Sequence, residues 1–142
     1  MVDAARVTRR DTGTKSNGFY EPVNTIVLVG PEGQVVCERC EIADGFFSRA
    51  RGLLGRTQLL RGQGMLIRPT WSVHTAFMRF AIDVVFLDAE LTVLKVARQL
   101  RPWRVATRLR AHSVLELPSG ECERLRIDVG DRLAWGSLEP GR

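Results

Sequence analysis

The stretch FAIDVVFL, residues 80–87, decides the fold of this chain. Apolar side chains recur at every second position from Phe80 to Phe86, which gives an extended chain one continuous apolar face. The opposite face is also mainly apolar and holds a single carboxylate, that of Asp83. A strand that is apolar on both faces must be covered on both faces. We therefore predict a central strand here.

Further extended segments lie on both sides of this strand in the sequence. Asp88, Ala89 and Glu90 form a turn, after which the chain returns as a partner strand. The turn over residues 30–33 joins two short apolar runs into a predicted hairpin. The predicted strands cover residues 25–29, 34–37, 64–68, 71–78, 92–100, 113–117 and 132–135.

The clearest helical pattern follows Asp44, a residue type that favours helix N-termini. Apolar side chains then recur at the spacing of one helical stripe, and Gly55 ends the pattern. Residues 119–127 leave room for a second, short helix. The stripe consists of Phe46, Phe47, Ala50, Leu53 and Leu54.

These segments add up to one domain, because 142 residues with 44% hydrophobic content suffice for a single core. We expect an α+β domain with a mainly antiparallel sheet over residues 23–138. Residues 1–22 show no apolar periodicity, so we predict a flexible leader there. We predict a short tail over residues 139–142. No apolar run is long enough to span a membrane, and three cysteines fit a reducing compartment. These features favour a cytoplasmic protein.

Positive charge gathers after the central hairpin. The chain carries 21 Lys and Arg against 16 Asp and Glu, a net charge of +5. Five arginines surround one tryptophan in a segment whose composition suits phosphates and a stacked base. We keep this segment as a candidate site for an anionic ligand. An ordinary solvated surface is the more common explanation of such a basic segment, and nucleic acid is the less favoured partner because no nucleic-acid motif accompanies the segment. Its members are Arg98, Arg101, Trp103, Arg104, Arg108 and Arg110.

The cysteines give no sign of a metal centre or a cofactor. Cys37 and Cys40 have a Cys-x-x-Cys spacing, but a zinc site needs four ligands and a redox site needs a helix N-terminus. Cys122, His74 and His112 could complete a ligand set only from unpaired positions. We therefore predict no bound metal, no cofactor and no obligatory disulfide.

Four polar residues interrupt apolar strands or lie next to them: His74, Arg79, Asp83 and Glu116. Asp83 and Glu116 stand between apolar neighbours, so each carboxylate must find donors inside the protein. If the four side chains converge, they form a binding pocket, or a hydrolytic site with Asp83 or Glu116 as the base. Alternatively, each carboxylate is structural, and we expect Asp83 to be buried and hydrogen-bonded.

An ordered set of motifs resembles the bacterial and archaeal family catalogued as domain of unknown function 192. The resemblance covers about residues 36–135 and implies a compact α+β domain whose strands curl into a barrel-like sheet. It implies no reaction and no cofactor. Some relatives are linked to pilus-assembly genes, which favours an accessory role there or in secretion. The motifs are SRARGLLGR (residues 48–56), GML (64–66), HT (74–75), MRF (78–80), IDV (82–84), VLELPSG (114–120) and GD (130–131).

The leading functional hypothesis is thus a small accessory or binding domain with a polar pocket on an apolar sheet. A small hydrolase is the alternative from another class, although the sequence contains no nucleophile motif. The ligand, the partners and the oligomeric state do not follow from the sequence.

Overall fold

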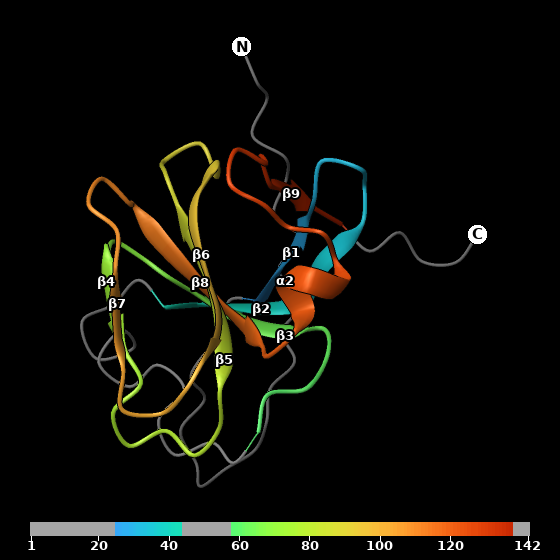
Figure 1. The fold of residues 1–142 in the computed structure, drawn as a ribbon. Coiled ribbons are helices and arrows are strands. Elements are labelled where there is room, and N and C mark those ends of the chain that lie inside the picture. The colour runs from blue at the N-terminus through green and yellow to red at the C-terminus, as the bar shows by residue number, and fades with distance from the viewer. Residues whose placement is uncertain (1–24, 44–57, 138–142) are drawn as a thin grey trace, which may run out of the picture.

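A computed structural model describes residues 25–43 and 58–137 of the chain. The described residues form a curved seven-stranded sheet with a two-stranded sheet beside it (Figure 1). The strands are β1 (Thr25–Val29), β2 (Val35–Ala43), β3 (Gln63–Ile67), β4 (Ser72–His74), β5 (Ile82–Leu87), β6 (Val93–Leu100), β7 (Val105–Thr107), β8 (Ser113–Pro118) and β9 (Ala134–Gly136). The described helix is α2 (Glu121–Arg124).

The order of strands in the large sheet is β6-β5-β8-β3-β2-β1-β9, and β4 pairs with β7 in the small one. β2 and β3 are parallel, and all other paired strands are antiparallel. The predicted hairpin, the strand after it and the central strand are confirmed as β1–β2, β3 and β5. Every residue of β5 is buried, because β6 and β8 flank it and side chains cover both faces.

The predicted fold class is wrong in two respects. Of the described residues, 51% are strand and 4% are helix, so this part of the chain is mainly β and not α+β with a clear helix. The helix expected over residues 44–55 lies outside the described residues, whereas the short helix expected within 119–127 is confirmed as α2. The large excess of strand has a physical reason: both faces of β5 and β8 are covered mainly by side chains from other strands.

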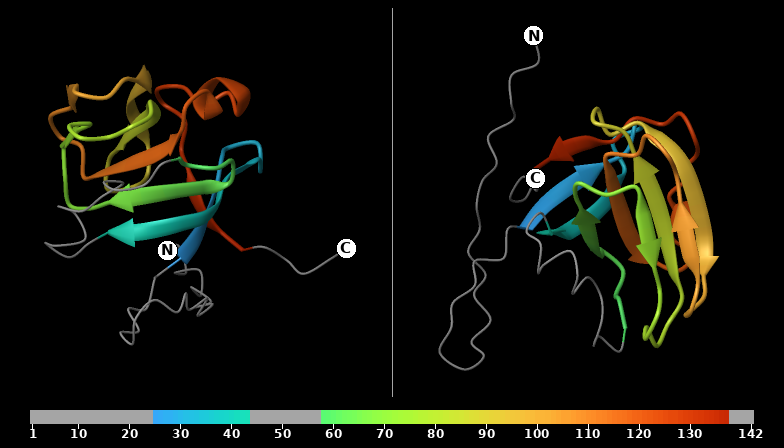
Figure 2. Two further views of the ribbon diagram at one scale, coloured as in Figure 1. Left: turned by 90° about the horizontal axis from the view of Figure 1, so that it is seen from below. Right: turned by 90° about the vertical axis from the view of Figure 1, so that its left-hand side faces the viewer.

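The sheet is curved but does not close into a barrel, contrary to the expectation drawn from the family resemblance. Its two ends are β6 and β9, and between them the described residues form one isolated bridge, Thr92 to Arg132. β9 is short, so it pairs with β1 and extends no ladder to β6. The two views in Figure 2 show this curvature.

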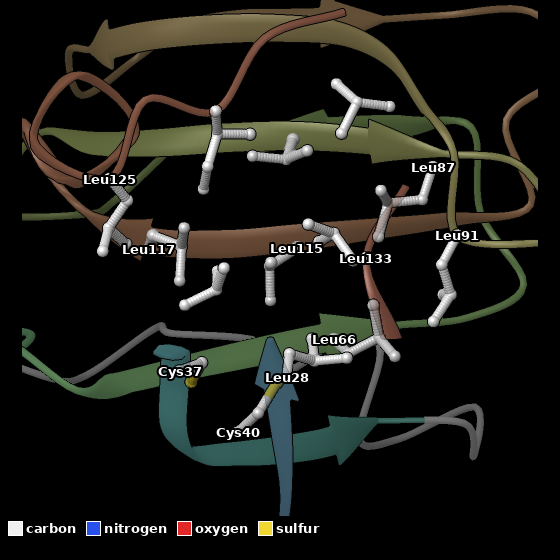
Figure 3. Close-up of a cluster of buried hydrophobic side chains, with 14 of the residues drawn as sticks. Leu28, Cys37, Cys40, Leu66, Leu87, Leu91, Leu115, Leu117, Leu125 and Leu133 are labelled. Atoms are coloured by element: carbon white, nitrogen blue, oxygen red, sulfur yellow. The ribbon is translucent and has the colours of Figure 1, made fainter. Parts of the chain in front are cut away.

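Two apolar clusters cover the two faces of the large sheet. The first packs β1, β2, β3, β5 and β8 against α2 and the segment that follows it, as Figure 3 shows. The second lies under the small sheet, which contributes Val73 of β4 and Ala106 of β7. The small sheet and α2 therefore lie on opposite faces of the large sheet, and we call β4, β7 and their connecting loops the outer layer (Figure 1).

No helix among the described residues is long and apolar enough to cross a membrane.

Candidate binding surface on the outer layer

Asp83 is a structural residue of the core. Its side chain is fully buried, as predicted. Oδ1 accepts a hydrogen bond from the backbone N–H of Gln99 at 2.8 Å, and Oδ2 accepts one from the N–H of Cys122 at 2.8 Å. The first bond fixes the irregular end of β6, where Gln99 has a φ of 50°. The second satisfies a free N–H in the first turn of α2. Asp83 thus ties β5 to β6 and to α2.

Glu116 lies on the other face of the sheet. In the ladder between β5 and β8, Asp83 is opposite Leu117 and Val84 is opposite Glu116. Side chains alternate between the two faces of a strand, so neighbouring pairs point in opposite directions. Leu117 belongs to the first apolar cluster and Val84 to the second. The two carboxylates therefore do not meet in one pocket.

His74 and Arg79 are both exposed and belong to the outer layer. His74 ends β4 and pairs with Val105 of β7, and Arg79 lies in the loop between β4 and β5. The four residues singled out from the sequence are thus divided between the surface and two faces of the core. The polar pocket that they were expected to form together does not follow from this placement.

The predicted arginine cluster is divided as well. Arg98 forms an ion pair with Asp128, its Nη2 lying 3.2 Å from Oδ1. Arg101 and Arg104 lie at one end of β7, and Arg108 and Arg110 follow its other end. The two pairs are separated by the strand itself, about 13 Å between Arg104 and Arg108 at the usual strand rise.

Buried Thr75 joins two loops at the first of these ends. Its Oγ1 donates to the carbonyl oxygen of Arg101 at 2.6 Å and accepts from the N–H of Arg104 at 2.9 Å. Its backbone N–H donates to the carbonyl of Arg104, and its carbonyl accepts from the N–H of Trp103. Thr75 is fully buried, so these hydrogen bonds fix the junction between the two loops.

The junction holds two aromatic side chains out toward solvent. The rings of Phe77 and Trp103 meet edge to face with centroids 4.6 Å apart, yet Phe77 is 72% exposed and Trp103 61% exposed. Both have positive φ values, 64° and 63°, in the left-handed region that costs a residue with a side chain about 1–2 kcal/mol. An exposed ring contributes little to the stability of the fold. Backbone strain at two such residues is therefore typical of a binding site.

Several exposed arginines lie in the same loops as this pair or follow β7. The exposed arginines of the outer layer form no ion pair with any residue that the structure describes. No acidic residue occurs between Asp44 and Asp83 or between Glu90 and Glu116, the two parts of the chain that build the outer layer. These arginines are Arg79, Arg101, Arg104, Arg108 and Arg110.

Apolar side chains are also exposed at the other end of the outer layer. Trp71 is 51% exposed and Leu109 is 68% exposed, and the N–H of Arg108 donates to the carbonyl of Trp71 at 2.9 Å. Between the two ends, Val105 of β7 is 69% exposed. We call the exposed residues Trp71, His74, Phe77, Arg79, Arg101, Trp103, Arg104, Val105, Arg108, Leu109 and Arg110 the aromatic–arginine surface.

Sequence reasoning found the arginines and Trp103 but missed Thr75 and Phe77. Residues 71–78 were expected to form one strand, whereas β4 ends at His74 and a loop follows. A strand would have placed Phe77 on a regular face, and a positive φ cannot be read from the residue type. The available sequence signal for this surface was the absence of acidic residues from the two chain segments that build the outer layer.

The cysteines lie in the core, which agrees with a structural role. Cys37 and Cys40 face the same cluster because β2 has a bulge opposite β1, where the pairs shift between Ile26–Cys40 and Leu28–Cys37. The neighbouring Cys37 thiol and burial raise the pKa of Cys40. Burial and the nearby Asp83 carboxylate raise the pKa of Cys122. No cluster of potential metal ligands occurs within residues 25–43 and 58–137.

We expect Ellman's reagent to react slowly with native protein at about pH 8 and with all three thiols after unfolding in guanidinium, because only an accessible thiolate is nucleophilic. Rapid labelling of native protein would contradict the buried placement.

The raised pKa values of Cys40 and Cys122 also make the stability of the protein depend on pH. Above the ordinary thiol pKa the unfolded chain loses protons that the native chain keeps, so the free energy of unfolding falls as the pH rises.

Comparison with known proteins gives the family. Residues 27–135 match the model of DUF192, described as "Uncharacterized ACR". The chain is 38% identical over 120 residues to the UPF0127 protein of Pyrococcus abyssi (strain GE5 / Orsay), covering 80% of this chain and 95% of that one. It is 36% identical over 111 residues to the UPF0127 protein of Pyrococcus furiosus, covering 75% and 95%.

A solved structure shares the fold. A protein of unknown function from Novosphingobium aromaticivorans DSM 12444 superposes with a TM-score of 0.73 at 22% identity, covering 95% of this chain and 99% of that one. At that identity the likeness concerns the fold alone. The family match covers most of the chain, and the resemblance expected from the motifs is confirmed. The chain belongs to the DUF192 family of uncharacterized proteins.

Proposed function

We propose that this protein is a binding module whose aromatic–arginine surface receives an anionic ligand. The observation that carries the proposal is the loop junction at Thr75, which fixes Phe77 and Trp103 in exposed positions next in sequence to arginines that form no ion pair with any described residue. A rigid aromatic platform with cationic neighbours suits a ligand that combines negative charge with a flat or apolar part. A binding module is also compatible with the accessory role in pilus assembly or secretion that the family resemblance implies.

The hydrolase alternative gains no support from the described residues. A general base must reach its proton at hydrogen-bond distance. Asp83 has no exposed surface, and both of its oxygens accept backbone hydrogen bonds. Glu116 is 4% exposed and lies on the other face of the sheet. Binding is therefore the function that the geometry favours.

Titration with linear polyphosphate, a polyanion without an aromatic part, tests whether the arginines of this surface bind negative charge. We expect wild-type protein to bind it at low salt and the double variant Arg101→Ser/Arg104→Ser to bind several-fold more weakly, since each arginine neutralises phosphate charge. The affinity should fall as salt is added. Binding is measured by isothermal titration calorimetry.

Arg39→Ser is the matched control, because Arg39 is an exposed arginine on β2, outside the outer layer. It removes one positive charge, as the single variant Arg104→Ser does, and should leave the affinity nearly unchanged. Equal losses in the control and in the single variant Arg104→Ser would mean that net charge alone causes the binding. The proposal would also be refuted if wild-type protein bound no polyanion at low salt.

A further inference from the structure

We infer that the ligand of the aromatic–arginine surface is single-stranded nucleic acid, with a base stacked on the exposed Phe77–Trp103 pair and phosphates held by the flanking arginines. This inference rests on the binding function proposed above and adds the chemical class of the ligand.

The aromatic pair is suited to stacking because both residues are largely exposed to solvent. Phe77 and Trp103 touch through an edge contact with an interplanar angle of 60°, and each residue keeps more than half of its surface exposed. Every nucleobase has a flat face that can stack on such a ring, independent of its hydrogen-bonding edge. A base in a duplex is already stacked on both sides, so the pair favours an unpaired strand.

The charges on the same surface select a polyanion over a protein. A typical protein partner would present carboxylates and cations together, whereas the outer layer offers cations alone over two long acid-free stretches of chain. Arg79, Arg101 and Arg104 are each within two residues of Phe77 or Trp103 in the sequence. Aromatic rings with guanidinium groups close by in the chain suit the bases and phosphates of a single strand.

The surface continues along β7 to its far end. Arg108 and Arg110 lie there together with exposed Trp71, about 13 Å from Arg104 at the usual strand rise. A second aromatic ring with its own arginines allows a strand to be held at two points. We therefore expect a ligand of several nucleotides, and mononucleotides to bind much more weakly.

The decisive experiment compares two DNA strands of equal length and charge. Oligothymidylate of about eight nucleotides carries bases, and an abasic strand of the same length carries only sugar and phosphate. Fluorescence anisotropy of labelled strands at low salt gives both affinities. We expect oligothymidylate to bind about tenfold more tightly than the abasic strand, and this ratio to fall toward one in Trp103→Ala and in Phe77→Ala.

Trp135→Ala is the control for loss of a tryptophan, because Trp135 lies on β9, an end strand of the large sheet, and outside the outer layer. It should keep the wild-type ratio. Arg104→Ser should weaken both strands alike and reduce the salt dependence of binding by roughly 0.7 in the logarithmic slope. Urea unfolding of each variant checks that the fold is retained.

The outcomes separate the two proposals. Equal affinity for the two strands in wild-type protein overturns the inference about nucleic acid but leaves anion binding in place. Tighter binding of a polyglutamate peptide than of oligothymidylate also overturns the inference, in favour of an acidic protein partner. If neither strand, nor polyphosphate, nor the peptide binds at low salt, both the inference and the proposed function fail.

Discussion

Asp83→Ala lowers the free energy of unfolding by about 1–3 kcal/mol, the expected cost of leaving a buried donor without an acceptor. The variant removes the acceptor of two backbone N–H groups, those of Gln99 and Cys122, each bonded at 2.8 Å. The N–H of Cys122 cannot turn to water, because Cys122 and Asp83 are both fully buried, whereas Gln99 is exposed at the end of β6. Urea denaturation followed by circular dichroism measures the change in midpoint.

Asp83→Asn gives the sharper test of this arrangement. Both partners of Asp83 are donors and each uses a different oxygen, so an amide can accept one bond but must turn its NH2 group toward the other N–H. We therefore expect the asparagine variant to be destabilised by roughly 1–2 kcal/mol despite its equal size.

Asp88→Asn is the matched control. Asp88 accepts from the N–H groups of Glu90 and Thr92 through the single atom Oδ1, which the oxygen of an asparagine amide replaces. Its stability should stay within about 0.5 kcal/mol of wild type. An Asp83→Asn variant that unfolds at the wild-type midpoint, with an unchanged slope, would falsify the two-oxygen role of Asp83.

The core of the fold could be predicted from the sequence because its signal is local. Alternation of apolar residues from Phe80 to Phe86 identifies β5, and the apolar residues on its other face show that it is central. Burial and hydrogen bonding of Asp83 followed from the same pattern. The excess of sheet over helix could not be predicted, because apolar periodicity identifies each strand or helix but does not show which elements pack on its faces.

The site could be predicted only in part, for a related reason. Charge density marked Arg101 and Arg104, but an ion pair that draws Arg98 toward Asp128 depends on chain segments far apart in the sequence. The separation of Asp83 from Glu116 depends on the register between β5 and β8, which single-sequence reasoning does not fix. Thr75 joins two loops through hydrogen bonds to residues 101–104, so the sequence around Thr75 alone does not predict this role.

Thr75→Val is expected to destabilise the protein by about 1–3 kcal/mol and to loosen the binding surface without touching a surface residue. Valine has the shape of threonine but no hydroxyl, so the carbonyl of Arg101 and the N–H of Arg104 lose their shared partner in a buried position. The N–H of Arg104 should then exchange with deuterium faster, while Trp103 keeps its bond to the Thr75 carbonyl.

Thr75→Ser separates the hydroxyl from the shape of the side chain. Serine keeps the oxygen that donates to Arg101 and accepts from Arg104, so it should protect the Arg104 N–H and retain the preference for oligothymidylate over the abasic strand. The valine variant should lose much of that preference although Phe77, Trp103 and the arginines are unchanged, because a loosened platform must be ordered again on binding. If valine and serine variants bind alike and exchange alike, the hydroxyl does not hold the two loops together.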